Sequence, residues 1–306
     1  MQGRIINLNG GVYKVLLDDN NIVSIKARGK LRSEKMVGIN EKSMSKKATL
    51  LTIKNSPKVG DIVLVKNDMI DQILPRKNQL IRPDIANVDQ ILLVFAACEP
   101  DFSFYLLDLF LVNILKQGIT PVIVITKIDK IEKTKLELLK NDLLYYKNLG
   151  YQIIFVNSIS KEGIEEVSNA LAGKITVLSG QTGAGKSTLI NALIPEFKLQ
   201  TQEISMALGR GKHTTRQTNL YAYKDGFIGD TPGFSKLDIS NIDKYELPSL
   251  FKEFNDYNCK FKDCIHLPNM LGCAIYQAVL DNKILKSRYD NYLKMQQLMT
   301  NKERKK

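Results

Sequence analysis

The sequence predicts a multidomain protein, with an N-terminal β-barrel over residues 1–68, a central α/β domain over residues 69–240 and a mainly helical domain over residues 241–306. Short strands separated by turn residues favour the barrel. Apolar strands that alternate with helices favour a parallel sheet in the central domain. Three cysteines and a histidine clustered in the last domain indicate a metal site.

The N-terminal barrel is predicted from four short apolar segments, Val12–Leu17, Ile22–Ile25, Ala48–Ile53 and Asp61–Val65. So many short strands within 68 residues favour a closed barrel of the OB-fold type. Residues 28–47 form a polar and basic stretch without periodicity. On an OB-fold such a loop is well placed to contact RNA, although a disordered surface loop accounts for it equally well.

The central domain contains three continuous apolar runs that predict buried strands, Ile91–Ala97, Pro121–Ile125 and Gln152–Val156. Residues 104–116 and 132–148, which lie between them, show the apolar spacing of helices. Strands that are apolar on both faces and alternate with helices indicate a parallel sheet covered by helices on each side.

A phosphate-binding loop is predicted between a further strand, Ile175–Leu178, and a helix that includes Leu189–Leu193. The pattern G-x-x-x-x-G-K-S lies within Gly180, Gln181, Thr182, Gly183, Ala184, Gly185, Lys186, Ser187 and Thr188. The glycines let backbone N–H groups turn towards a polyphosphate, Lys186 neutralises phosphate oxygens, and Ser187 offers its hydroxyl to Mg²⁺. The complete pattern, between a strand and a helix, disfavours an ordinary Gly/Ser turn.

A guanine-binding motif of the form T-K-x-D directly follows a buried strand, at Thr126, Lys127, Ile128 and Asp129. The Asp129 carboxylate can accept hydrogen bonds from N1–H and the exocyclic amine of guanine. Adenine presents the opposite donor pattern, so the motif selects GTP over ATP. Ser158, at the end of the next strand, is placed to contact the base through its backbone.

A D-x-x-G motif, Asp230–Gly233, ends another short strand. In that role Asp230 holds a Mg²⁺-bound water and the Gly233 N–H contacts the γ-phosphate. The base motif here precedes the P-loop, whereas ordinary GTPases place it afterwards. A parallel sheet tolerates this order because the motifs need only meet at the carboxyl ends of neighbouring strands. The central domain is therefore predicted to be a circularly permuted P-loop GTPase.

Intrinsic GTP hydrolysis is expected to be slow, because Phe234 stands where Ras-like enzymes place the Gln that orients the attacking water. Another residue must then orient that water. His213, between the two phosphate motifs, is the candidate catalytic residue, since a neutral imidazole can orient a water or accept its proton. A surface histidine in a mobile basic loop is the alternative. Thr215, in preference to Thr214, is the expected switch I ligand of Mg²⁺ and the γ-phosphate, and Lys186 completes the catalytic set.

A metal site is predicted at Cys259, Cys264, His266 and Cys273, which offer three thiolates and one imidazole, a closed set typical of structural zinc. The polar residues around them indicate a loop, which disfavours free core cysteines and a stray histidine. The remaining cysteine, Cys98, ends an apolar run and is predicted to be a buried core thiol. Beyond the loop, apolar residues at helical spacing are predicted to pack on the domain: Leu285, Tyr289, Tyr292, Met295 and Met299.

The composition, 44% hydrophobic and 25% charged residues among 306, is that of a soluble globular protein. The net charge is +12, and both ends are basic: residues 1–66 hold 13 Lys and Arg against 5 Asp and Glu, and residues 282–306 hold 8 against 2. This asymmetry favours a nucleic-acid partner over solvated lysine-rich surfaces. Without a signal peptide or an apolar run of membrane-spanning length, a cytoplasmic protein with no membrane contact is expected.

Together these motifs resemble the RsgA (YjeQ/YloQ) family of small ribosomal subunit-dependent GTPases over essentially the whole chain. Shorter segments carry the resemblance too: Leu74–Asn78, Arg82–Pro83, Ala86–Gln90, Glu99–Ser103 and Gly209–Thr215. The resemblance implies an OB barrel, a circularly permuted GTPase domain and a C-terminal zinc-binding domain that act in late maturation of the small (30S) ribosomal subunit. Two departures are visible, Thr126 where GTPases most often carry Asn, and a gap between His266 and Cys273 that is one residue longer than expected.

Two functions of different class remain open from the sequence. The preferred one is a monomeric GTP hydrolase that binds GTP and GDP with Mg²⁺, holds one structural Zn²⁺ per chain, binds rRNA and is stimulated by the small ribosomal subunit. The alternative is a GTP-sensing RNA-binding chaperone whose hydrolysis is incidental, which Phe234 keeps open.

Overall fold

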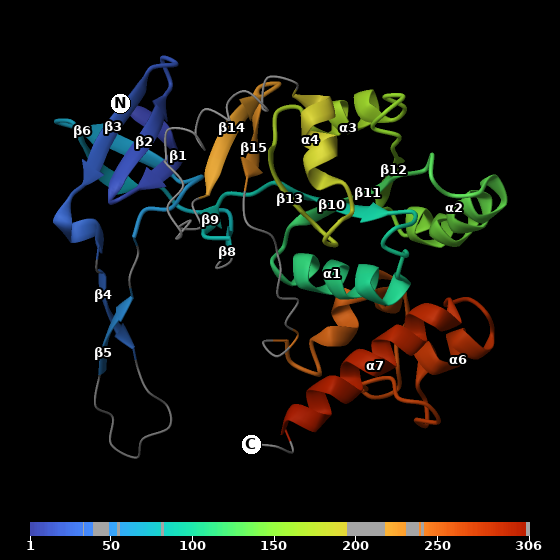
Figure 1. Cartoon of the computed structure of the whole chain (residues 1–306). Coiled ribbons are helices and arrows are strands. Elements are labelled where there is room, and N and C mark those ends of the chain that lie inside the picture. The colour runs from blue at the N-terminus through green and yellow to red at the C-terminus, as the bar shows by residue number, and fades with distance from the viewer. Residues whose placement is uncertain are drawn as a thin grey trace. The chain divides into compact units, whose positions relative to one another are not determined.

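The computed structural model describes residues 1–32, 34–38, 49–53, 56–80, 83–194, 218–230, 239 and 242–303 (Figure 1). The chain divides into two compact units. The first comprises Met1–Val88, Gly173–Val177 and His213–Pro232, and the second comprises Asp89–Ala172, Leu178–Lys212 and Gly233–Lys306. The boundary passes through strand β13 (Ile175–Gly180), so the units do not coincide with the three predicted domains, whose limits stay a prediction.

The predicted N-terminal barrel is confirmed as a closed ring of five strands, β1 (Gln2–Asn9), β2 (Val12–Leu17), β3 (Ile22–Ala27), β6 (Ile62–Lys66) and β7 (Met69–Ile73). β1 pairs with β2 and β6, β2 with β3, β6 with β7, and β3 runs parallel to β7 to complete the ring. Because β7 begins at residue 69, the closing strand lies just beyond the predicted barrel limit. The interior is filled by fully buried apolar side chains, among them Ile5, Val15, Val63 and Ile70.

The basic stretch 28–47 is more regular than the sequence indicates. A short 3₁₀ helix, η1 (Gly29–Arg32), precedes strand β4 (Glu34–Gly38), which pairs antiparallel with β5 (Thr49–Ile53). The prediction of a loop is therefore wrong for β4. Its partner lies more than ten residues away in the chain, and such a pairing leaves no periodic signal in a window of local sequence. Residues 39–48 lie outside the described residues.

The first unit also contains two strands from the predicted central domain. Strand β14 (Asn219–Tyr223) and strand β15 (Gly226–Asp230) pair antiparallel, and β15 runs parallel to β13. Strand β1 of the barrel pairs antiparallel with β14, with Asn7 opposite Asn219. The short strands β8 (Gln79–Leu80) and β9 (Ile85–Ala86) pair with each other.

The second unit confirms the predicted parallel sheet. Strands β10 (Gln90–Ala96), β11 (Thr120–Thr126) and β12 (Gln152–Phe155) pair in parallel, and every residue of β10 is buried. The helices of this part are α1 (Phe104–Lys116), α2 (Lys133–Asn148), α3 (Ile164–Leu171) and α4 (Lys186–Leu193). The first two match the predicted helical ranges to within one residue.

The C-terminal part of this unit consists of η2 (Leu247–Leu250), η3 (Lys252–Asp256), α6 (Ala274–Leu280) and α7 (Lys286–Glu303). The predicted apolar stripe packs inward, since Tyr289, Tyr292, Met295 and Met299 are buried. Leu285 lies one residue before α7 and stays 36% exposed. None of the helices that the structure describes is both long enough and apolar enough to cross a membrane.

The C-terminal helices do not have a core of their own. Val112 of α1 belongs to the same hydrophobic cluster as Phe251, Tyr292 and Met295. Arg288 of α7, only 2% exposed, forms ion pairs of 2.5 Å with Asp108 of α1 and Glu253 of η3. Helix α1 therefore packs in the core that surrounds the cysteine loop.

Candidate functional site

The glycine-rich loop lies between β13 and α4, the strand–loop–helix context that the sequence predicts. Gly180, Gly183 and Gly185 all have positive φ angles, of 130°, 79° and 83°. A Cβ atom at Gly180 would lie 2.0 Å from the carbonyl oxygen of Val94 on β10. Only glycine fits this position, since side chains rarely tolerate that φ and none could occupy that space. The backbone path of the loop is thus fixed by its glycines.

Lys186, the first residue of α4, reaches back into this loop. Its Nζ donates hydrogen bonds to the carbonyl oxygens of Gly180 at 2.9 Å and Gln181 at 2.7 Å. Burial lowers the pKa of Lys186 below the usual lysine value. An ammonium group at a helix N-terminus, partly removed from water, favours an anionic ligand there.

Thr126, at the end of β11, lies against the glycine-rich loop. Its hydroxyl is buried, 2.5 Å from the carbonyl oxygen of Ala184 and 3.1 Å from that of Phe95. A hydroxyl has a single proton, so it donates to one of the two carbonyls at a time. The structure thereby brings the T-K-x-D segment next to the P-loop, and the Thr that replaces the more usual Asn keeps a direct link between them.

The rest of the T-K-x-D segment turns away from the strand. Lys127 has a positive φ of 56°, and its Nζ donates to the Glu99 carbonyl oxygen. Ile128 is buried, whereas Asp129 is exposed on the rim of a groove of about 970 Å³ that α2 also lines. Ser158 lies in a turn closed by Asn157, whose side chain accepts from the Ile159 N–H at 2.9 Å.

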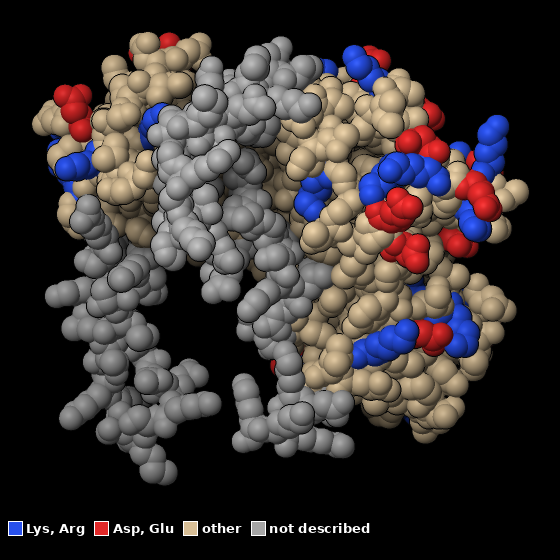
Figure 2. Space-filling view, in the orientation of Figure 1, with Lys and Arg blue, Asp and Glu red and all other residues tan. Residues whose placement is uncertain are grey.

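Charges of both signs surround this groove. Lys140 forms an ion pair with Glu137 at 2.9 Å, and Lys135 lies 3.4 Å from Glu132. Figure 2 shows Lys and Arg alongside Asp and Glu in the part of the surface that corresponds to α2 in Figure 1. The charges around the groove therefore favour neither an anionic nor a cationic ligand.

Several predicted site residues lie outside the described residues. These are His213, Thr214 and Thr215 of the expected switch I segment, together with Gly233 and Phe234 after the D-x-x-G aspartate. Asp230 is described only as the last residue of β15. Gln181, Thr182 and Gly183 lie in the loop, and Ser187 and Thr188 lie in the first turn of α4. The roles of all these residues stay predictions.

The four predicted metal ligands come together in one cluster. The ligand atoms of Cys259, Cys264, His266 and Cys273 all lie within 4.8 Å of one another. The Nδ1 atom of His266 lies 3.4 Å from the Sγ of Cys259 and 3.6 Å from that of Cys273, and those two sulfurs are 3.9 Å apart. Tetrahedral zinc separates two sulfurs by about 3.8 Å and a sulfur from a nitrogen by about 3.6 Å. The donor set therefore fits a tetrahedral ion.

Backbone and tyrosine groups hold this cluster in place. The N–H groups of Ala274 and Tyr276 donate to the sulfurs of Cys259 and Cys273, both at 3.3 Å. The Tyr289 hydroxyl donates to the His266 carbonyl oxygen at 2.7 Å. Burial raises the pKa of the Cys273 thiol to about 12 and lowers that of His266. Donors aimed at sulfur favour thiolates, and a cation would have to offset the cost of burying their charge.

The loop after β10 places Glu99 and Pro100 near the nucleotide segments, and the sequence predicts a role for neither residue. The Cδ atom of Pro100 lies 3.6 Å from the position of a Cβ at Gly183, and Glu99 accepts from Lys127. This loop follows the carboxyl end of a buried parallel strand, a position typical of ligand-binding residues, and this feature of the sequence could have identified them. Cys98, predicted to be a buried core thiol, is only partly buried, with its Sγ 4.0 Å from the Lys127 carbonyl oxygen. That prediction is wrong because the strand ends before this residue.

Comparisons with known proteins agree with this geometry. A sequence profile described as RsgA GTPase matches residues 73–240. The small ribosomal subunit biogenesis GTPase RsgA of Onion yellows phytoplasma (strain OY-M) is 41% identical over 297 residues, covering 94% of each chain. The protein of the same name from Geobacillus thermodenitrificans (strain NG80-2) is 40% identical and covers 95% of each.

Two solved structures are similar over nearly the whole chain. The crystal structure of YjeQ from Thermotoga maritima has a TM-score of 0.80 at 32% identity and covers 98% of both chains. The crystal structure of YloQ, described as a circularly permuted GTPase, has a TM-score of 0.78 at 32% identity, covering 98% of this chain and 95% of the other.

Proposed function

The chain belongs to the RsgA GTPase family, and we propose that it hydrolyses GTP to GDP and phosphate in late maturation of the small (30S) ribosomal subunit. The observation that carries the activity is the bond between Thr126 and Ala184, which joins a T-K-x-D segment to a P-loop within one compact unit. Neither motif alone specifies a GTPase, but their adjacency supports a site for a guanine nucleotide.

Binding of the phosphates is assigned to the P-loop. Its backbone N–H groups and the N-terminus of α4 would face the β- and γ-phosphates, with Lys186 exchanging its two carbonyl acceptors for phosphate oxygens. Ser187 and Thr215 would hold Mg²⁺, and Asp230 would hold a water bound to it; the ion neutralises phosphate charge when bound.

Selection of guanine is assigned to Asp129, with Lys127, Ile128 and the Ser158 backbone around the base. The exposed Asp129 carboxylate is able to accept from a base that approaches from solvent. Thr126 would act indirectly, by holding the base segment against the P-loop.

Hydrolysis is assigned to His213, because Phe234 cannot orient water. The imidazole would accept a hydrogen bond from the attacking water and receive its proton as the water oxygen bonds to the γ-phosphorus. The bond between that phosphorus and the β–γ bridging oxygen breaks, and GDP leaves. Without a partner that positions His213, GTP hydrolysis would be slow. Binding to the small subunit would position His213 and raise the rate of hydrolysis.

The cysteine cluster is assigned a structural role. Cys259, Cys264, His266 and Cys273 would hold one Zn²⁺, which supplies a cross-link between the cysteine loop and the start of α6. The four protein ligands would fill all the positions of a tetrahedral ion, which would leave none for a substrate.

The partners follow from charge and family. Basic residues of the barrel and the C-terminal part would contact rRNA of the small subunit, with the protein acting as a cytoplasmic monomer. The deciding experiment is multiple-turnover GTPase activity of the full chain with small subunits, large subunits or naked RNA. Stimulation by small subunits alone supports the proposal. Small subunits that bind better with GTP but leave turnover unchanged would favour the chaperone alternative.

A further inference from the structure

One row of residues crosses from the barrel to the strand that carries the D-x-x-G aspartate. Asn7 on β1 lies opposite Asn219 on β14, and Asn219 lies opposite Asp230 on β15. The Asn7 side-chain amide donates to the Asn219 side-chain oxygen. Figure 1 shows β1, β14 and β15 side by side. All three strands belong to the first compact unit, so the row lies within one body.

A second contact joins the same strands. The Arg4 guanidinium of β1 lies 5.8 Å from the centre of the Phe227 ring on β15. Arg4 and Asn7 flank a bulge in β1, where the pairing with β2 shifts register between Ile5 and Asn7. Bulges twist a strand and redirect its side chains. We call the four residues Arg4, Asn7, Asn219 and Phe227 the β1–β14 seam.

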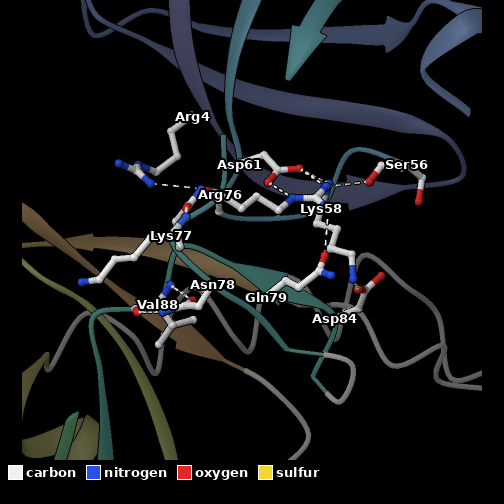
Figure 3. Close-up of polar contacts among 12 residues, drawn as sticks. Arg4, Ser56, Lys58, Asp61, Arg76, Lys77, Asn78, Gln79, Asp84 and Val88 are labelled. Atoms are coloured by element: carbon white, nitrogen blue, oxygen red, sulfur yellow. Dashed lines mark hydrogen bonds and ion pairs between the residues drawn. The ribbon is translucent and has the colours of Figure 1, made fainter. Parts of the chain in front are cut away.

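The barrel end of the seam is held rigidly. The Arg4 Nη1 donates to the Gly60 carbonyl oxygen at 3.0 Å, and the Gly60 N–H donates to that of Ile5 at 2.8 Å. Next to Gly60, the fully buried Asp61 accepts two hydrogen bonds of 2.7 Å from Arg76 (Figure 3). Any displacement of this part of the barrel would therefore carry β1 with it.

At the other end of the seam, β14 and β15 are adjacent in sequence to the proposed catalytic segments. Residue 215 of the predicted switch I lies four positions before Asn219, and Asp230 ends the hairpin that β14 and β15 form. The seam itself is small, with a single registered pair of residues between β1 and β14. A small contact of this kind can be shifted by a modest difference in ligand binding energy.

We infer that the β1–β14 seam is the positioning contact through which a partner bound to the barrel accelerates hydrolysis. Asn7 and Asn219 are its positioning residues, since neither is among the residues assigned to the phosphates, the base or Mg²⁺. A partner that holds β1 in one arrangement would fix β14 and β15, and with them the segments that place water and Mg²⁺. The inference rests on the proposed function, because it needs a GTPase that small subunits stimulate.

The test compares the full chain with Asn7→Ala, Asn219→Ala and the double variant, with increasing amounts of small subunits. We expect the stimulated kcat to fall by about 5- to 150-fold, the range of allosteric coupling, with no change in intrinsic kcat or in the KM for subunits. The pair Asn7→Asp with Asn219→Lys replaces the bond by an ion pair at unchanged net charge and should restore stimulation. The matched control is Asn21→Ala, whose amide donates to Asp19 in a barrel turn.

Each outcome bears on the inference. Full stimulated kcat in the double variant overturns it, and so does a raised KM with normal kcat, which would make the seam a binding surface. If the double variant does not fold, Phe227→Leu keeps an apolar strand residue and removes the ring beneath Arg4, and unchanged stimulation there is equally contrary. Should small subunits fail to stimulate the wild-type chain, the proposed function fails along with the inference. If small subunits stimulate the wild-type chain and the seam variants equally, only the inference fails.

Discussion

The nucleotide segments and the cysteine cluster build their binding sites by opposite means. In the P-loop the groups proposed to face the phosphates are backbone N–H groups, and glycines such as Gly180 fix the backbone path by fitting where no side chain can. In the cluster the binding atoms are side-chain sulfurs and a nitrogen, brought together from a loop that has little regular structure. The P-loop has internal hydrogen bonds through Lys186, whereas in the cluster four possible metal ligands lie within 4.8 Å of one another.

The two regions are nevertheless joined by α1. That helix follows the loop that contacts Lys127, and its Val112 and Asp108 pack against the C-terminal helices. Two regions that differ in chemistry thus share one helix, so a substitution in one region is expected to affect the other.

Removing the metal should produce the largest effect. Zinc binding contributes about 10–16 kcal/mol of apparent folding energy in small zinc domains, so Cys264→Ser should unfold α6 and α7. Circular dichroism and elemental analysis measure this, with one zinc per chain expected in the wild type. Cys98→Ser is the control. Because α1 shares the C-terminal core, we expect GDP affinity to fall moderately. Complete loss of GDP binding would show that the two regions are coupled more strongly than the packing implies. Unchanged GDP affinity would show that they are coupled less strongly.

The loss of His213 should affect only chemistry. His213→Ala is expected to lower stimulated turnover by about 10²- to 10⁴-fold, as for removal of a positioned acid–base group. GDP affinity and zinc content should not change. Single-turnover kinetics with saturating small subunits provide the measurement, and a variant with full stimulated activity would return His213 to an ordinary surface residue.

Asp108→Ala tests the helix that joins the two regions. It leaves Arg288 buried without one of its two carboxylates, and breaking a buried pair costs about 3–5 kcal/mol. The matched control is Lys116→Met, which removes the partly exposed pair with Glu246 at the end of the same helix and should cost at most about 1 kcal/mol. Urea unfolding measures both. Equal effects of the two substitutions would contradict a buried link between the regions.

Asp129→Asn should change the nucleotide that is preferred. Exchanging the acceptor for a donor removes hydrogen bonds to a charged group, worth about 1.5–3 kcal/mol, and favours xanthosine triphosphate over GTP. Competition binding of the two nucleotides gives the ratio. Unchanged GTP affinity would remove the assignment of the base site.

Gly180→Ala and Gly173→Ala form the finest comparison, since both glycines have positive φ angles, of 130° and 69°. A Cβ at Gly180 meets the Val94 carbonyl oxygen at 2.0 Å, whereas nothing lies within 4 Å of one at Gly173. Each change adds backbone strain of about 1–3 kcal/mol, but only Gly180→Ala should also weaken GDP binding. Thermal unfolding and GDP titration separate the two effects.

The sequence by itself determined the features that depend on neighbours along the chain. The strand–loop–helix at Gly180–Lys186, the ranges of α1 and α2 and the cysteine spacing were all predictable, because periodicity, turn residues and ligand spacing are local. The T-K-x-D segment is likewise local, since four consecutive residues carry it.

Only the tertiary structure decided how these pieces meet. The pairing of Asn7 with Asn219 joins residues more than two hundred positions apart, and the burial of Arg288 between Asp108 and Glu253 places the C-terminal helices on the core that includes α1. Strand β4 likewise exists only through its partner β5. Hydrogen bonds across strands and ion pairs out of water form between surfaces that folding brings together, so no local pattern announces them.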